Sequence, residues 1–189
     1  MTRDLLVFHH AMGVTLGVES FAQGIAGPRH TVRLADLFDG QTFASVEGGV
    51  AHAEGIGFGE IAEAGARWAA PYADGAVAIG LSLGALPAQK LAQSGAGLVG
   101  VVLCHSVVPV QAFGDGWPSS VSVQIHLGAD DPWAAEDLDA AHDLAARSEG
   151  ELHLYPTAAH LVTDDSHPDH DPAIAATIIE RTRGFIAGL

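Results

Sequence analysis

The chain has 189 residues, 48% of them hydrophobic, which is enough to build one domain around a sizeable core. Its formal net charge of −15 disfavours nucleic acid and anionic membrane surfaces as partners, because both are bound through Lys and Arg. The only cysteine, Cys104, excludes an internal disulfide and fits a reducing compartment. No apolar run approaches a membrane span of roughly 20 residues or forms a secretory signal, so we expect a cytoplasmic protein.

Apolar runs alternate with helical patterns almost to the end of the chain. In chain order we expect a strand at 5–8, a helix at 15–26, a strand at 31–35, one or two helices within 43–70 broken near 55–57, a strand at 76–79, a helix at 85–92, strands at 98–104 and 121–127, a helix at 134–147, a strand at 152–155 and a last helix from Asp171-Pro172. Asp171 is a suitable N-cap, and proline suits the first helical position. Ile174, Ile178 and Phe185 should form the buried stripe of this last helix.

This alternation of strands and helices predicts a doubly wound α/β domain over residues 1–189, with a mostly parallel sheet covered by helices on both faces. The third and fourth strands are nearly continuous apolar runs, as expected where both faces are buried. The fifth strand alternates apolar residues with Ser122, Gln124 and His126, so it should lie nearer an edge. We found no internal repeat or interdomain linker in the sequence.

The segment from Gly80 to Gly84 reads G-x-S-x-G and lies between an apolar strand and a helical run. In that context the pattern is typical of a nucleophile elbow, a tight turn that lifts a serine above the sheet edge. The glycines are required because the turn is strained and its backbone is crowded. Ser82 is therefore the candidate nucleophile.

A serine nucleophile needs a histidine to accept its proton. In α/β-hydrolases the chain order is nucleophile, acid, histidine, and the groups lie beyond the carboxyl ends of strands. His160 follows the sixth strand and satisfies both conditions. His167 and His170 come later in the same segment and are weaker candidates.

The acid that orients the histidine should follow the fifth strand, where Asp130 and Asp131 precede Pro132. An aspartate before proline can also be a simple helix cap. One carboxylate cannot easily do both jobs, so we expect one aspartate to orient the histidine and the other to cap.

Over essentially its whole length the chain resembles the dienelactone hydrolase family of α/β-hydrolases. The motifs that carry the resemblance are His9-His10-Ala11-Met12-Gly13, Asp36 to Gly40, Gly80 to Gly84, Gly128 to Trp133, and Tyr155-Pro156 with His160. The family pattern favours Asp131 as the acid, and it implies that the backbone N–H groups of Leu83 and Ala11 form the oxyanion hole.

The resemblance also has consequences for the fold and for the lining of the site. Compared with the usual α/β-hydrolase, two leading antiparallel strands are missing, which implies six strands in the order 2-1-3-4-5-6. The connection 106–120 is too short for a lid domain, so the site should be open. The residues expected to line the site are His10, Met12, Trp133 and Asp164.

Three positions depart from the family's namesakes. They carry cysteine in the elbow where this chain has Ser82, and glutamate beside the oxyanion donor where it has His10. An arginine that binds the lactone carboxylate is replaced by Asp164. The chain therefore resembles a serine-bearing branch, and we expect Asp164 to repel anionic substrates, so that neutral esters are preferred.

These features predict hydrolysis of a small carboxylic ester, thioester or lactone through an acyl-serine, with a small-molecule substrate and with neither nucleic acid nor membrane as a partner. No cofactor and no metal are expected. The alternatives are a metal site among the histidines and aspartates of residues 160–170, and a non-catalytic module on a hydrolase-like fold. A dinucleotide fold is disfavoured, because the nearest Gly-rich match follows a helix instead of a strand.

Overall fold

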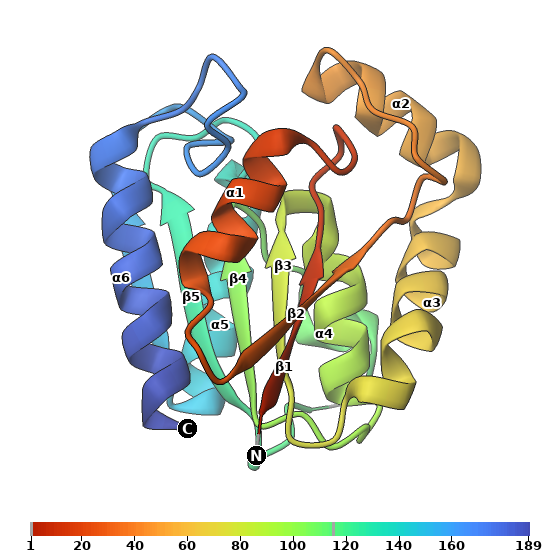
Figure 1. The fold of residues 1–189 in the computed structure, drawn as a ribbon, viewed down its shortest axis with the longest axis vertical. Coiled ribbons are helices and arrows are strands. Elements are labelled where there is room, and N and C mark those ends of the chain that lie inside the picture. The colour runs from red at the N-terminus through yellow and green to blue at the C-terminus, as the bar shows by residue number, and fades with distance from the viewer. Residues whose placement is uncertain (1, 115) are drawn as a thin grey trace.

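Six parallel strands form one sheet in the order β2-β1-β3-β4-β5-β6 (Figure 1). The strands are β1 (Arg3–Phe8), β2 (His30–Ala35), β3 (Val77–Leu81), β4 (Gly100–Cys104), β5 (Ser122–Gly128) and β6 (Glu151–Tyr155). This computed structural model describes residues 2–114 and 116–189. Met1, where the predicted domain begins, and residue 115, within the predicted connection 106–120, lie outside the described residues. The expected strand order and parallel pairing are confirmed.

Helices cover both faces of the sheet (Figure 1). They are α1 (Leu16–Ile25), α2 (Val46–Ile56), α3 (Phe58–Ala69), α4 (Ala85–Gln93), α5 (Leu138–Ser148) and α6 (Pro172–Gly188). α1 and α6 pack on one face of the sheet, and α3, α4 and α5 pack on the other. Within the described ranges, no helix has both the length and the apolar character needed to cross a membrane.

The helix boundaries follow from local capping. The side chains of Thr15 and Ser45 accept hydrogen bonds from backbone N–H groups in the first turns of α1 and α2. Asp171 caps α6 in the same way, as the Asp-Pro pair predicted. Gly57, with a φ of 98°, ends α2 and begins α3, which is the predicted break in this helical region.

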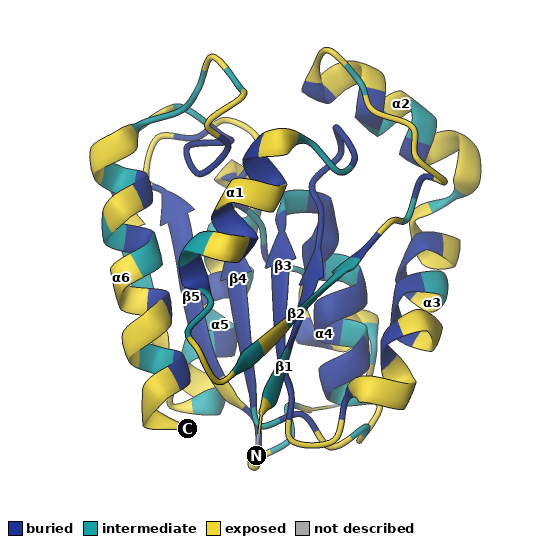
Figure 2. Ribbon diagram, in the orientation of Figure 1, coloured by how far each residue is buried: buried dark blue, intermediate teal, exposed yellow. Residues whose placement is uncertain are grey.

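Alternate side chains of the central strands enter two separate cores. On β3, Val77, Ile79 and Leu81 face α1 and α6, whereas Ala78 faces the opposite helices. β3 and β4 are buried along their whole length, as their continuous apolar runs predicted (Figure 2). In α6 the buried stripe includes Ile178, but Ile174 and Phe185 are only partly buried.

β5 lies next to the edge strand β6, but its polar side chains Gln124 and His126 are not exposed to solvent. Both are buried and belong to one hydrogen-bonded chain. Gln124 donates to the Glu151 carboxylate at 2.8 Å, and its carbonyl oxygen accepts from His126 Nε2 at 3.0 Å. His126 Nδ1 then accepts from the Tyr155 hydroxyl at 2.8 Å. The alternation in the sequence therefore marks a buried polar network instead of a solvated face.

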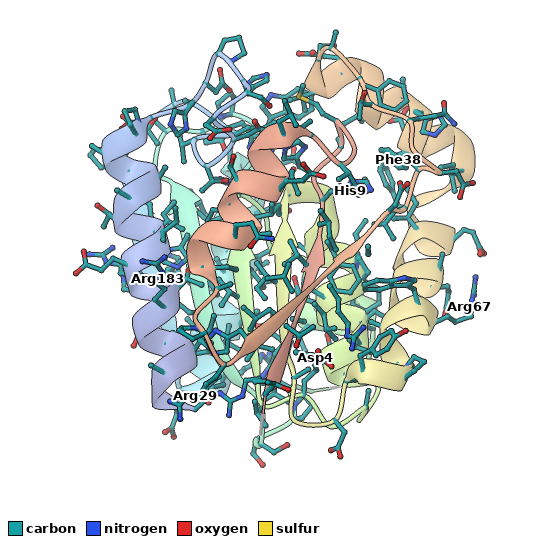
Figure 3. All side chains as sticks on the ribbon, in the orientation of Figure 1. Asp4, His9, Arg29, Phe38, Arg67 and Arg183 are labelled. Carbon is teal, nitrogen blue, oxygen red and sulfur yellow. The ribbon has the colours of Figure 1, made fainter. Side chains whose placement is uncertain are left out.

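His9 follows β1 and is also buried without a charge partner. Its Nδ1 donates to the His10 carbonyl at 2.7 Å and its Nε2 accepts from the Leu37 N–H at 3.0 Å, which fixes a neutral ring. The ring lies edge-on to Phe38, with centroids 4.8 Å apart (Figure 3). Burial lowers the pKa of His9 to about 4, and burial likewise lowers the pKa of His126 to about 3.

These two histidines should make the fold sensitive to mild acid. Their folded pKa values lie below the unfolded value of 6.5, so the unfolded chain binds more protons as the pH falls. Their full contribution to stability is present above about pH 6.5 and is lost as the pH falls toward 4 and 3. We expect the free energy of unfolding to be roughly 2 kcal/mol lower per histidine at pH 5 than at pH 7. Urea denaturation at constant ionic strength tests this, and equal values at both pH values would contradict it.

Two glycines of α3 give a matched test of helix packing. A Cβ added to Gly65 would lie 2.5 Å from Pro87 Cβ of α4, whereas nothing lies within 4 Å of a Cβ added to Gly59. We expect Gly65→Ala to lower the free energy of unfolding by about 1–3 kcal/mol through overpacking. Gly59→Ala should leave it unchanged or raise it by up to about 1 kcal/mol. Chemical denaturation of both variants measures the difference. Equal changes in the free energy of unfolding would show that α3 and α4 accommodate the added methyl group without destabilisation.

Candidate active site

Ser82 occupies the turn between β3 and α4, where the backbone is strained and crowded. Its φ of 49° lies in the left-handed region that non-glycine residues seldom adopt. A Cβ on Gly80 would lie 2.6 Å from the Gly84 carbonyl oxygen, and one on Gly84 would collide with the Phe8 carbonyl of β1. Both glycines of the motif are therefore required by close backbone contacts.

Ser82, His160 and Asp131 come from three separate loops and form one chain of hydrogen bonds. Ser82 Oγ lies 2.8 Å from His160 Nε2, and His160 Nδ1 lies 2.6 Å from Asp131 Oδ2. Because the carboxylate can only accept, Nδ1 carries the ring proton and Nε2 is left to accept the Ser82 hydroxyl. His160 and Asp131 are buried, while Ser82 is partly exposed. This arrangement can move the serine proton onto the imidazole as the hydroxyl attacks an electrophile.

Asp131 is the aspartate that contacts His160, and its second oxygen closes a turn instead of capping a helix. Its Oδ2 meets His160, and its Oδ1 accepts from the Trp133 N–H at 2.9 Å. Asp130 is exposed, and its own N–H donates to the Thr157 carbonyl. The expected helix cap is wrong, because α5 begins only at Leu138 and neither aspartate accepts a hydrogen bond from its first turn.

His167 and His170 make other contacts. The His170 ring donates from Nδ1 to the Val162 carbonyl at 2.9 Å. His167 Nδ1 accepts from the Asp169 N–H at 3.2 Å. Within the described residues, no group of three or more His, Cys, Asp or Glu side chains is arranged to hold a metal ion.

The two expected oxyanion donors are neighbours in space. Ala11, in the turn after β1, and Leu83, directly after Ser82, belong to one small buried cluster with Phe38, Ala53 and Ile61. Among the residues that the structure describes, the Ala11 N–H has no hydrogen-bond acceptor. A Cβ on Gly49 of α2 would collide with the Ala11 carbonyl, so α2 packs directly against the turn after β1.

Asp164 does not line the site as expected. It is 1% exposed, and its carboxylate accepts from His10 Nε2 at 2.8 Å, from the Thr15 hydroxyl at 2.5 Å and from Ser166. Both oxygens are thus occupied by donors of the protein itself. The prediction that Asp164 faces and repels a substrate carboxylate is wrong for this reason.

The other three residues expected to line the site differ in exposure. His10 is 1% exposed and Met12 is 7% exposed, packed against Val46 and Leu161. Trp133 is 44% exposed, and its ring centroid lies 6.0 Å from that of His160. Trp133 is therefore the one of these three that offers a large apolar surface beside the Ser82–His160 pair.

His105, which directly follows β4, also lies at the site and was not among the predicted site residues. Its φ is 72°, its ring centroid lies 5.9 Å from that of His160, and its Nε2 is 2.8 Å from the Thr163 hydroxyl. Burial lowers the pKa of His105 well below its usual range, and His160 adds to the effect. Its position after an apolar strand at the carboxyl edge of the sheet was a signal in the sequence.

No family model matches the chain, and a search of curated proteins gave no match. Solved structures do match it. A dienelactone hydrolase-like promiscuous phosphotriesterase from metagenomic libraries is 26% identical, with a TM-score of 0.78 over 99% of this chain and 86% of that one. A protein named as a dienelactone hydrolase from Klebsiella pneumoniae is 15% identical, with a TM-score of 0.74 over 100% of this chain and 88% of that one.

A third structure, from work on metagenome-derived lipolytic enzymes, is 16% identical with a TM-score of 0.64 over 100% of this chain and 95% of that one. At such identities the second and third likenesses bear on the fold alone. The strand order and the three neighbouring structures together show that the chain has a hydrolase fold. The chain has an α/β-hydrolase fold and is similar in structure to dienelactone hydrolase-like proteins.

Proposed function

We propose that this protein is a serine hydrolase that cleaves a small carboxylic ester, thioester or lactone through an acyl-serine intermediate. The observation that carries the proposal is the unbroken contact from Ser82 Oγ through His160 to Asp131, at 2.8 and 2.6 Å. The neighbour described as dienelactone hydrolase-like, at 26% identity, supports the same reaction class.

In the proposed reaction Ser82 Oγ attacks the substrate carbonyl while His160 Nε2 takes the hydroxyl proton. Asp131 holds the ring in the required tautomer and stabilises the imidazolium. The tetrahedral oxyanion accepts hydrogen bonds from the Leu83 and Ala11 N–H groups. As the carbonyl re-forms, the bond to the alcohol or thiol breaks, and His160 gives that leaving group its proton. Water then attacks the acyl-serine by the same route, releasing the acid and restoring Ser82.

Cys104 offers no competing nucleophile. It lies on β4 and is fully buried, and this burial raises the pKa of its thiol. A buried, protonated thiol neither reaches a substrate nor attacks it. The nucleophile in this chain is therefore the serine that replaces the namesakes' cysteine.

The proposed preference for neutral substrates rests on the charge of the loops around the site and not on Asp164. The loops at the carboxyl edge of the sheet cover residues 9–15, 36–45, 82–84, 105–114, 129–137 and 156–171, and they contain neither lysine nor arginine. All eight basic residues lie elsewhere in the chain. A substrate carboxylate would thus find no cation in these loops, so neutral esters are the proposed substrates.

The competing proposals are a non-catalytic module and a metal-binding module on the same fold. Labelling with a fluorophosphonate separates them from a serine hydrolase, because the probe needs an activated serine. Stoichiometric labelling that Ser82→Ala removes supports the enzyme. No labelling together with tight binding of zinc would favour the metal-binding module.

Ser82→Ala should abolish ester hydrolysis and leave the fold intact. Loss of a triad nucleophile costs on the order of 10⁴–10⁶ in kcat. Steady-state hydrolysis of p-nitrophenyl acetate measures the loss, and circular dichroism checks the fold. Turnover by the purified variant at the wild-type rate would refute the assignment of the nucleophile.

Asp131→Asn and Asp130→Asn remove the same charge from adjacent positions. Asp131→Asn should lower kcat by roughly 10⁴, because an asparagine favours the wrong histidine tautomer. Asp130→Asn should stay within about twofold of the wild type, since its side chain is exposed. The same esterase assay compares them, and the opposite ranking would move the role of the acid to Asp130.

A further inference from the structure

We infer that His10 and Asp164 form a buried positioning pair that holds the turn carrying the Ala11 N–H in the orientation needed to bind the oxyanion. The inference rests on the proposed function and adds two residues to its machinery. In this role neither residue touches the substrate. Both act through the backbone of the turn after β1.

Both nitrogens of the His10 ring are already engaged. The Met12 N–H donates to Nδ1 at 3.2 Å, so the ring proton is on Nε2, which donates to Asp164 Oδ2 at 2.8 Å. The ring is 1% exposed. No nitrogen remains to exchange a proton with a substrate, which excludes a general acid or base role for His10.

The hydrogen bond from the Met12 N–H to His10 Nδ1 closes a tight turn around Ala11. A side chain that accepts the N–H two residues later fixes the peptide groups in between, as an Asx turn does. The same turn is closed by Gly13, whose N–H donates to the His10 carbonyl at 3.1 Å. The direction of the Ala11 N–H therefore depends on where the His10 ring is held.

Asp164 is a fixed anchor for that ring. Burial alone would raise the pKa of Asp164, but hydrogen bonds from His10, Ser166 and Thr15 outweigh it and hold the pKa well below its usual range. The carboxylate lies at the start of α1, where helix N–H dipoles favour a negative charge. A Cβ on Gly17 would collide with Oδ1, so α1 approaches the carboxylate as closely as a glycine allows.

Asp164 belongs to the loop that carries His160, and its N–H donates to the Leu161 carbonyl at 3.0 Å. The pair thus joins two segments that are 154 residues apart in sequence. One segment holds the proposed base and the other the proposed oxyanion donor. The buried, charge-assisted hydrogen bond between His10 and Asp164 helps to fix their relative position, together with the bond from the Thr15 hydroxyl.

The test compares an ester with its thionoester, in which sulfur replaces the carbonyl oxygen and accepts hydrogen bonds poorly. Asp164→Asn should lower kcat for the ester by about 10–100-fold, because a displaced oxyanion donor loses most of its effect. KM should change by less than about twofold, since substrate contacts are kept. The ratio of ester to thionoester rates should fall by about tenfold, because only the oxygen substrate uses the donor fully.

Asp165→Asn is the matched control, because it removes the same charge from an exposed neighbour. It should change neither kcat nor the ratio by more than about twofold. Ser166→Ala removes one donor to Asp164 at an exposed position and should give a smaller loss in the same direction, about threefold. This milder variant keeps the test valid if Asp164→Asn fails to fold.

An unchanged ester-to-thionoester ratio in folded Asp164→Asn and in Ser166→Ala would overturn the pair's role, even if kcat fell, because a general loss of structure slows both substrates alike. Failure of the proposed function looks different. It would appear as wild-type turnover in Ser82→Ala, whatever the Asp164 variants do.

Discussion

Direct backbone contact between the end of β1 and the turn after β3 places Ser82 beside the two proposed oxyanion donors. Gly84 lies against the Phe8 carbonyl so closely that no side chain fits, and Phe8 leads into the turn that holds Ala11. The contact puts Leu83 and Ala11 in one cluster and raises Ser82 beside the loop of His160. Parallel pairing of the strands places the remaining groups, Asp131 and His160, because it brings the later loops to the same edge of the sheet.

Two buried His–Asp pairs lie at this edge within the described residues, and the available nitrogen atoms give them different roles. In the pair with Asp131, one nitrogen of His160 is left for Ser82. In the pair with Asp164, the second nitrogen of His10 is taken by a backbone N–H. Residue types alone therefore do not define a proton relay. The neighbours of the second nitrogen decide whether a histidine moves a proton or holds a loop.

The strands, the helices and the strand order could be predicted because they follow from local patterns and from the winding rules of α/β folds. The same rules brought Ser82, Asp131 and His160 to neighbouring loops. The burial of Asp164 could not be predicted, because its partners His10 and Thr15 are about 150 residues away. The double use of Asp131 and the polar chain through His126 likewise depend on side-chain directions that periodicity does not encode.

The distribution of charge along the chain also bears on the release of product. Basic residues lie in strands, in helices and at the end of the molecule opposite the site, and Figure 3 labels Arg29 at that end and Arg67 and Arg183 on the two flanks. The molecule therefore has an electric dipole whose negative end is the reactive edge. On the proposed function, hydrolysis turns a neutral ester into an anion, which this negative edge repels. The acid product would then bind weakly, and added salt would reduce the repulsion by screening the field.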